Sequence, residues 1–366
     1  MRHFGWKLAV MVVFGTFAAV GRAETINARV VDGPNTNVVE PAAPIPPVAP
    51  AEPVAPVPTI PPVASEGVTC QLWGGVGAMS GDVTYEIGGA YSASDGTFGR
   101  VNSPLSRLKW PIDVLSATVG GSLTMARFWE LNGRWSGNLS SDSGRVEDSD
   151  WESPYNPRLK TTYSVSDTDL NAMTADVGLR CWALNWVLNR QNDYSVGFGA
   201  GWLYQDLRWE ASNVDQQDLT AGQYARHTRT PGVVATYKTD LSMPYLDIAC
   251  QMRVPWLSFF GSLGYSPIAQ FRDEDDHKLR TLLAKTSADG NAFKLTLQGR
   301  CDYNSHVFAV IRADLISYDL TGNMHKSEYA VDDTGHVNIT KPDEVTVHNN
   351  ITSVQDNITI AIGVKF

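Results

Sequence analysis

Apolar and polar side chains alternate along most of the chain after about residue 68. From Tyr194 to Trp202, large and mostly apolar side chains occupy every second position, and serine or glycine occupies the positions between them. The final ten residues repeat the pattern, with three isoleucines, a valine and Phe366 on one face. A period of two indicates β-strands with two unlike faces. A soluble β-sandwich alternates in the same way, so the period alone leaves the fold class open.

Three features favour a membrane barrel over a sandwich. The predicted strands often exceed ten residues, aromatic residues such as Trp202 and Tyr204 recur on the apolar row, and the chain ends in a strand at Phe366. A closed barrel satisfies every backbone hydrogen-bonding group within lipid. We therefore expect an all-β fold, a ten-stranded antiparallel transmembrane β-barrel over residues 68–366, located in the outer membrane.

The ten predicted strands are separated by short turns and long polar loops in alternation. The strands are expected near residues 69–88, 105–123, 128–141, 166–185, 194–211, 235–252, 256–278, 292–303, 306–322 and 352–366. Tight turns are expected near Ala126, Asn189, Val254 and Asn304, and long loops near residues 89–104, 142–165, 212–234, 279–291 and 323–351. Short turns at one end and long loops at the other are typical of an outer-membrane barrel whose loops face the exterior.

Two segments precede the predicted barrel. A basic start, an apolar stretch from Leu8 to Val20 and small residues up to Ala23 predict a signal peptide over residues 1–23. Eleven of the twenty prolines lie between Pro34 and Pro62. Because proline fixes φ and removes a donor, we expect residues 24–67 to be a disordered Pro-rich periplasmic linker. It is either an inert tether or a ligand for another envelope component.

Composition narrows the classes of partner. A formal net charge of −10 argues against nucleic acid, whose phosphates require a basic surface. The only long apolar run, Leu8–Gly21, is too short for a transmembrane helix. The cysteines form no CxxC motif and no cluster with histidine, which argues against a zinc site. Spacing leaves disulfide formation open among Cys70, Cys181, Cys250 and Cys301.

Candidate chemistry lies in two acidic motifs. Asp148 and Asp150 are two residues apart, and Asp273, Asp275 and His277 also step by two, so each set shares a face of extended chain. A carboxylate beside an imidazole orients the ring and can make it a general base for water. A second carboxylate pair across a cleft can hold that water or the reacting carbonyl. Solvated rim charges are the alternative, and a calcium site is a further one that the histidine fits poorly.

With these motifs in place, the chain from about Val68 to Phe366 resembles the omptins, outer-membrane endopeptidases built as ten-stranded barrels. Four motifs match in the same order. They are Asp148-Ser149-Asp150-Trp151, Ser166-Asp167-Thr168-Asp169-Leu170-Asn171, Tyr237-Lys238 followed by Met243-Pro244-Tyr245, and Tyr265-Ser266 through Asp273, Asp275 and His277.

The resemblance implies a role for each matching residue. Asp275 and His277 correspond to the dyad that activates water, and Asp148 and Asp150 to the opposing pair. Asp273 corresponds to an acid that selects arginine or lysine before the scissile bond by charge pairing. The family adds a glutamate from the first strand to that pocket. Glu86 is the candidate, although it lies one residue later than the family spacing, and a one-residue slip reverses a strand side chain.

The resemblance also implies that lipopolysaccharide binds the outer face and activates the enzyme. Tyr204, Asp206 and Arg208 look like the first part of that lipid site. They continue the lipid-facing row that begins at Tyr194, so the period of two independently places Asp206 and Arg208 near the headgroups, where arginine can pair with phosphate. Asp240 stands where the family has a further arginine, so we expect a weaker dependence on lipopolysaccharide.

The alternation along the predicted strand at residues 256–278 opposes a location of these acids in a cleft. The apolar row from Leu257 to Tyr265 continues by twos onto Asp273, Asp275 and His277, which would then face lipid. A cleft location requires a break in the alternation, and Pro267 is the expected place because proline within a strand marks a bulge or an edge.

The expected function is that of an outer-membrane endopeptidase whose active site faces the exterior. It would cleave peptide or protein substrates after arginine or lysine, with lipopolysaccharide as activator and with no metal. A catalytically inactive omptin-like barrel that serves as an adhesin is one alternative. A porin-type or structural barrel, tethered by its Pro-rich arm, is the other. Ten strands leave an interior that side chains usually fill, which disfavours a channel.

Overall fold

The computed structural model describes residues 67–366, apart from residues 127, 154, 190–191, 221–225 and 332–336. The predicted signal peptide and almost all of the predicted Pro-rich linker therefore lie outside the described residues. Among the described residues, no helix has the length and apolar character needed to cross a bilayer.

The described residues form antiparallel strands and one short 3₁₀ turn, η2, at Lys278–Arg280. The strands are β1 (Thr69–Ala93), β2 (Phe98–Pro111), β3 (Val114–Met125), β4 (Trp129–Asn138), β5 (Asp142–Asp150), β6 (Thr162–Asn189), β7 (Asn192–Asp218), β8 (His227–Val254), β9 (Leu257–His277), β10 (Leu282–Asp302), β11 (Val307–Val331) and β12 (Val337–Lys365).

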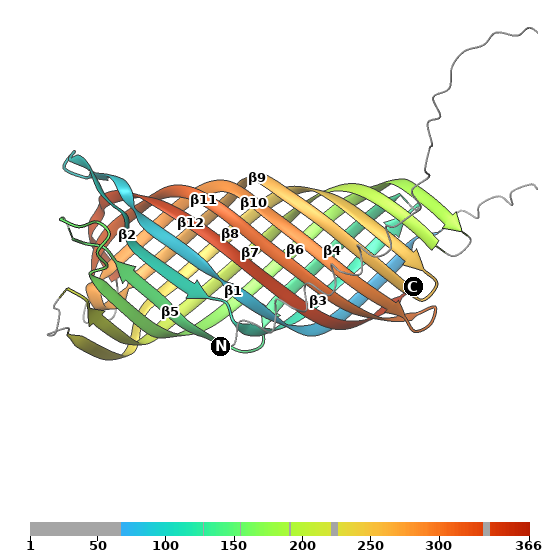
Figure 1. The fold of residues 1–366 in the computed structure, drawn as a ribbon, viewed down its shortest axis with the longest axis horizontal. Coiled ribbons are helices and arrows are strands. Elements are labelled where there is room, and N and C mark those ends of the chain that lie inside the picture. The colour runs from blue at the N-terminus through green and yellow to red at the C-terminus, as the bar shows by residue number, and fades with distance from the viewer. Residues whose placement is uncertain (1–66, 127, 154, 190–191, 221–225, 332–336) are drawn as a thin grey trace, which may run out of the picture. The chain divides into compact units, whose positions relative to one another are not determined.

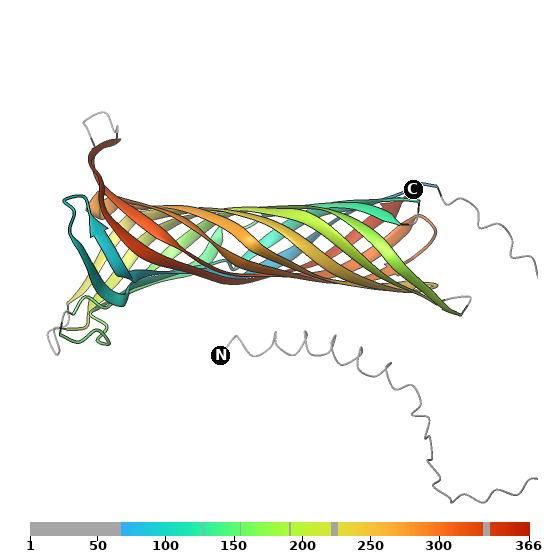
Figure 2. The same cartoon turned by 90° about the horizontal axis from the view of Figure 1, so that it is seen from above.

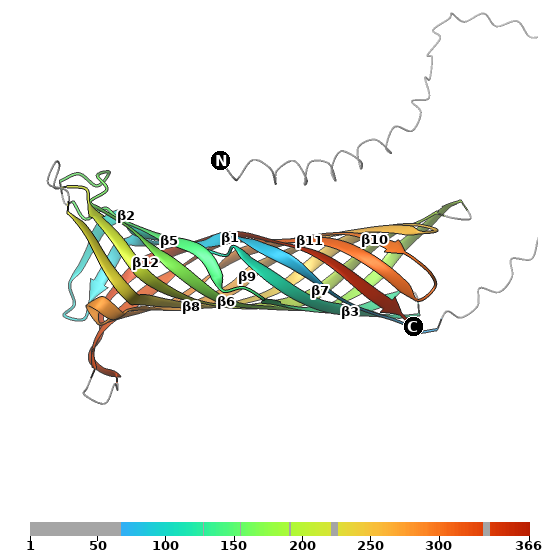
Figure 3. The ribbon, with the colours of Figure 1, turned by 90° about the horizontal axis from the view of Figure 1, so that it is seen from below.

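Ten of these strands close into a ring, which confirms the predicted barrel (Figure 1). Around the ring the described strands follow the order β12, β11, β10, β9, β8, β7, β6, β4, β3 and β1, and pairing of β1 with β12 closes it. The remaining two strands, β2 and β5, pair with each other and fill the gap between β1 and β6 at one end (Figure 3). Thus β2 and β3 together correspond to one barrel strand that is interrupted briefly after Pro111. β4 and β5 correspond to another, which is interrupted after Asn138.

The two ends of the barrel differ as the sequence predicts. Tight turns near Ala126, Val254 and Asn304 lie at the same end as the C-terminus (Figures 1 and 2). We call this the turn end and the opposite end the loop end. The remaining predicted turn follows Asn189, at residues outside the described set.

The prediction of long polar loops at the loop end is wrong for most of their length. β5 occupies residues 142–150, β7 continues to Asp218, and β10 begins at Leu282. β11 and β12 remain paired as far as Val331 and Val337. A ladder pairs backbone groups whatever the side chains are. Beyond the apolar band the outward positions also carry polar side chains, such as His325 and His348, so the contrast between the two faces that reveals strands within lipid weakens.

Side chains near the turn end show an inverted distribution. Large apolar residues such as Leu72, Val119 and Ile362 are exposed on the outer face, while the interior holds buried ion pairs such as Arg134 with Asp314. Apolar side chains outside and charges inside are typical of a transmembrane barrel. The four cysteines are free thiols, so none forms a disulfide in this structure.

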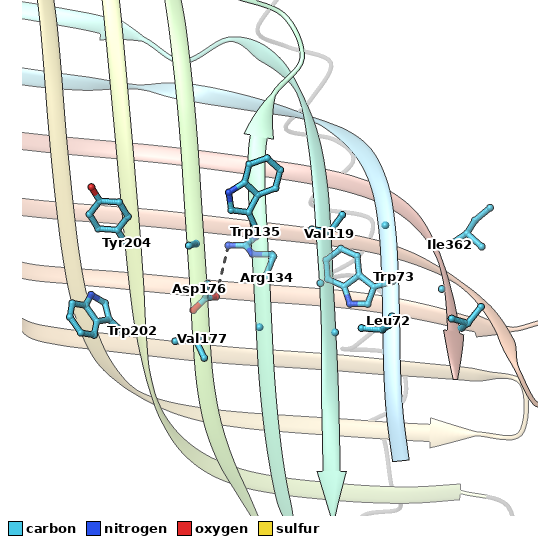
Figure 4. Close-up of a pocket in the computed structure, with 17 residues that line it drawn as sticks. Leu72, Trp73, Val119, Arg134, Trp135, Asp176, Val177, Trp202, Tyr204 and Ile362 are labelled. Carbon is cyan, nitrogen blue, oxygen red and sulfur yellow. Dashed lines mark ion pairs between the residues drawn. The ribbon is translucent and has the colours of Figure 1, made fainter. Parts of the chain in front are cut away.

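The lipid-facing surface carries an apolar hollow that crosses several strands (Figure 4). Trp202 and Tyr204 lie toward one end of it, Trp135 lies near its middle, and Leu72 and Ile362 lie toward the other end. Glycines on β1, β3 and β4 deepen it because they present no side chain. Arg134 and Asp176, drawn in the same view, form an ion pair of 3.9 Å.

A bulge in β9 reverses the alternation, which confirms the predicted break at Pro267. On the β10 side, Ala269 pairs with Gly290 and Ser266 with Ala292, so β9 carries one extra residue. Consequently Pro267 and Ile268 are both exposed, although they are consecutive. From Ala269 onward the odd-numbered residues point inward, which brings the acidic motif of β9 into the barrel.

Candidate active site

Asp275 and His277 form an acid–imidazole pair at the loop end of β9. Nε2 of His277 lies 3.0 Å from Oδ2 of Asp275. Asp275 is only 2% exposed, and His277 is half-buried. The outward-facing residues of β9 at this level, Arg272 and Glu274, are charged, so the pair lies beyond the apolar band.

The electrostatics of this pair suit proton transfer. The negative charge of Asp275 raises the pKa of His277, although burial acts in the opposite direction. When Nε2 carries the ring proton, it donates to Asp275 and leaves the Nδ1 lone pair to accept a proton from water. The arrangement can therefore work as a general base whose conjugate acid is stabilised by a buried carboxylate.

Asp148 and Asp150 belong to β5, which lies on a different wall of the barrel from β9. Asp150 is buried and Asp148 half-buried. Burial and then the neighbouring charge of Asp150 raise the pKa of Asp148 to about 7, while the charge of His277 opposes the rise. Asp148 and His277, 129 residues apart in sequence, therefore share one electrostatic environment. Near neutral pH Asp148 can therefore hold a proton and donate a hydrogen bond.

Asp273 lies one inward step deeper than Asp275 on β9. Its Oδ2 accepts a hydrogen bond of 3.0 Å from the hydroxyl of Tyr237, and its Oδ1 accepts one of 2.9 Å from the backbone N–H of Thr286. Burial raises the pKa of Asp273 to about 7, the bond from Thr286 opposes the rise, and the charge of Asp275 adds to it. Asp273 is therefore a buried acid whose charge changes in the neutral range.

The structure does not bring Glu86 to this site. Its carboxylate lies on the outer face, where it pairs with Nε of Arg107 on β2. Tyr85 takes the inward position instead, and its hydroxyl donates to Oδ2 of Asp275. The one-residue offset noted in the sequence accounts for this outcome, because consecutive strand residues face opposite sides.

An aromatic cluster lies among these acids. It consists of Tyr85, Trp110, Trp209 and Tyr237, all at most 2% exposed. The ring of Tyr237 stacks on Trp110 at 5.0 Å and on Trp209 at 5.6 Å, and lies 5.3 Å from Tyr85. These rings exclude water from below the site, which strengthens electrostatic interactions within it.

Two cations near the acids were not singled out in the sequence. Lys326 of β11 stands in one row with Asp275, across Ala284 of β10. Burial lowers the pKa of Lys326, and Arg280 of η2 lowers it further, while the charge of Asp275 raises it. Neither cation has a sequence signal, because both stand in segments interpreted as polar loops. Tyr85 was also missed, because the sequence left open which of the two adjacent residues, Tyr85 or Glu86, faces inward.

The sequence model of the Omptin family matches residues 75–366. The chain belongs to the omptin family. The plasminogen activator of Yersinia pestis is 26% identical over 210 residues, which are 56% of this chain and 65% of that protein. The match thus spans slightly less than two thirds of the relative's length.

The fold of this omptin is also that of a solved outer-membrane protease. OmpT from Escherichia coli aligns with a TM-score of 0.61 at 16% sequence identity, covering 83% of this chain and 98% of that one. The identity is low enough that this likeness speaks for the fold alone. Family and fold together place the protein in the outer membrane, as the sequence predicts.

The three residues that the sequence assigns to a lipid site lie on the outer face of this omptin. Arg208 donates two hydrogen bonds to Asp206, of 2.8 and 2.7 Å. The hydroxyl of Tyr204 donates to Asp240 across 2.6 Å. Asp240 pairs in register with Asp206 on one side and with Arg272 on the other. Asp240 therefore accepts the hydrogen bond of the Tyr204 hydroxyl and adds a second negative charge beside Asp206.

Proposed function

We propose that this omptin is an endopeptidase whose active site faces the exterior and that it cleaves substrates after arginine or lysine. The observation that carries the proposal is the contact between His277 and Asp275 in the electrostatic field of Asp148. Family membership supports it, as does the activity for which a relative, the plasminogen activator, is named. The mechanism and the substrate preference below belong to the same proposal.

In this mechanism His277 is the general base. Its Nδ1 takes a proton from water while the water oxygen bonds to the carbonyl carbon of the substrate. The carbonyl oxygen becomes an oxyanion, and the partly protonated Asp148, beside Asp150, donates a hydrogen bond to it. The imidazolium then returns the proton to the amide nitrogen as the C–N bond breaks. Asp275 orients the ring and stabilises its charged form.

Selection of the residue before the scissile bond is assigned to Asp273. Its buried carboxylate can pair with an arginine or lysine side chain that enters from the loop end. With Glu86 on the outer face, Asp273 is the acid that remains from the sequence-based assignment. The selection therefore rests on one acid whose charge varies near neutral pH.

Lipopolysaccharide is proposed as an activator that binds the outer face at Arg208. Arginine suits a lipid phosphate because its planar fork can donate two hydrogen bonds. In the structure that fork is already engaged by Asp206. A phosphate must compete with this carboxylate, and Asp240 adds repulsion. Both effects agree with a weak dependence on the lipid.

The direct test is incubation of the refolded chain with a peptide containing a single arginine, with and without lipopolysaccharide. We expect cleavage on the carboxyl side of that arginine, faster with the lipid present. The same peptide with citrulline in place of arginine keeps the shape without the charge and should be cleaved poorly. Absence of cleavage in every condition, with a folded barrel, would favour the adhesin alternative. Ion conductance in a planar bilayer would favour the porin-type alternative.

A further inference from the structure

We propose that Tyr85 is a positioning residue of the Asp275–His277 dyad, whose hydroxyl holds the same carboxylate oxygen that bonds the imidazole. The proposal rests on the proposed function, since it assigns a part in that mechanism to a residue from the opposite wall of the barrel. The sequence assigned no role to Tyr85. It assigned the neighbouring residue Glu86 to a substrate pocket, and the structure places Glu86 on the outer face.

The contact crosses the interior of the barrel. Tyr85 belongs to β1, which pairs with β2, β3 and β12, whereas Asp275 belongs to β9, which pairs with β8 and β10. The hydroxyl of Tyr85 nevertheless donates to Oδ2 of Asp275, the oxygen that lies 3.0 Å from Nε2 of His277. One carboxylate oxygen therefore receives both donors. A phenol fixed on the far wall restrains the carboxylate in a way that neighbouring strands do not.

The ring of Tyr85 is itself held rigidly. It is 2% exposed, and it lies 5.3 Å from the ring of Tyr237, which stacks on Trp110. A buried aromatic ring with a fixed hydroxyl loses little conformational entropy on forming its hydrogen bond. The packing thus makes the hydroxyl a preorganised donor, which is what orientation of a catalytic carboxylate requires.

The hydrogen-bond accounting of Asp275 shows why this donor matters. The carboxylate is almost fully buried, and within the described residues its Oδ1 has no hydrogen-bond partner. Without Tyr85, His277 would be its only side-chain donor in the part of the chain that the structure describes. Burying a carboxylate with so few donors is costly, so the phenol supplies a hydrogen bond that this carboxylate would otherwise lack.

The hydroxyl also affects the proton on the imidazole. A donor to Oδ2 stabilises the state in which Asp275 is charged and His277 is neutral, because there the carboxylate has no cation beside it. Removing that donor favours the protonated ring, so the pKa of the dyad should rise.

The other charged and titratable groups that act on the dyad come from several elements. They are Tyr237 from β8, Asp273 from β9, Arg280 from η2, Asp148 and Asp150 from β5, and Lys326 from β11. From β10, the residues paired with the dyad are Ala284 and Leu282, which carry no charge. All of these remain in place when only the hydroxyl of Tyr85 is removed, so the change can be assigned to that one donor.

The test compares Tyr85→Phe with Tyr237→Phe in the full-length refolded protein. Both variants delete one buried phenol hydroxyl, but the second deletes a donor to Asp273 rather than to Asp275. Tyr85→Phe should lower kcat roughly tenfold with little change in KM, as expected for loss of one hydrogen bond to a charged group. It should also move the acidic limb of the kcat profile upward by about half a pH unit. Tyr237→Phe should change KM and move that limb less than Tyr85→Phe does.

A second variant covers the case in which Tyr85→Phe does not fold. Fluorinated tyrosine incorporated at position 85 keeps the ring and is a stronger donor, so it should move the acidic limb downward. Wild-type kcat and an unmoved limb in Tyr85→Phe would overturn the proposal, as would equal shifts in both phenylalanine variants. His277→Ala separates the two levels of inference. Full activity in His277→Ala overturns the proposed function itself, whereas its loss beside an unaffected Tyr85→Phe overturns only the role of Tyr85.

Discussion

Tyr237 and Asp273 are joined across neighbouring strands by a hydrogen bond of 3.0 Å in the buried floor of the site. The second oxygen of Asp273 is bonded to the backbone N–H of Thr286. With the pKa of Asp273 raised to about 7, the acid proposed to bind a basic substrate residue is only partly charged near neutrality. Its position and its burial together determine how selectivity should vary with pH.

Binding of a peptide with arginine before the scissile bond should tighten as the pH rises through about 7. Arginine stays protonated throughout, while the charged fraction of Asp273 increases. Dissociation constants measured in the His277→Ala background isolate binding from catalysis. The citrulline peptide should show no such dependence, and Asp273→Asn should abolish it. Equal pH profiles for the two peptides would exclude charge pairing at Asp273.

His277→Ala should lower turnover by roughly 10²–10⁴, the usual contribution of general base catalysis. In the wild type, activity should fall as the pH drops through the pKa of His277, which Asp275 raises, because only the neutral ring accepts a proton. His325→Ala is a matched control, since His325 is an exposed histidine that contacts Thr346 instead of a catalytic acid. Wild-type turnover in His277→Ala would show that His277 is not the base and would favour the alternative in which the aspartates are solvated charges at the rim of the barrel.

Asp148→Asn should make the barrel more stable at pH 8 and have no effect on stability near pH 4. A carboxyl whose pKa is raised on folding binds its proton more tightly in the folded state. It therefore costs stability as the pH rises from its unfolded pKa near 4 toward about 7, and asparagine removes that cost. Thermal unfolding followed by heat-modifiable gel mobility at both pH values measures the difference. An identical difference at pH 4 and pH 8 would contradict the assignment.

Arg208→Ala should raise the lipopolysaccharide concentration needed for half-maximal activity, because a donor to phosphate is lost. Asp240→Arg should lower that concentration, because it removes a negative charge beside Asp206 and releases the hydroxyl of Tyr204. Titrations of activity against lipid for both variants test the site in opposite directions. If neither titration moves, the lipid does not bind at this face.

The structure agrees with the sequence wherever the argument depends on local periodicity. Alternating side chains predicted the strands inside the apolar band, since a strand in lipid must separate an apolar face from an inner one. The same count, applied to β9, required a break near Pro267, and the bulge occurs there. The spacing of Asp275 and His277 was sufficient to place them on one face, because residues two apart in a strand always share a side.

What the sequence could not determine depends on pairing between distant strands. Beyond the apolar band the contrast between the two faces of a strand is weak, so the continuation of β11 and β12 became visible only through their ladder. The choice between Glu86 and Tyr85 depended on the register of β1, where a shift of one residue exchanges the two faces. The bond from Tyr85 to Asp275 joins residues 190 positions apart. Only closure of the barrel brings their walls together, because no local pattern encodes which side chains meet across its interior.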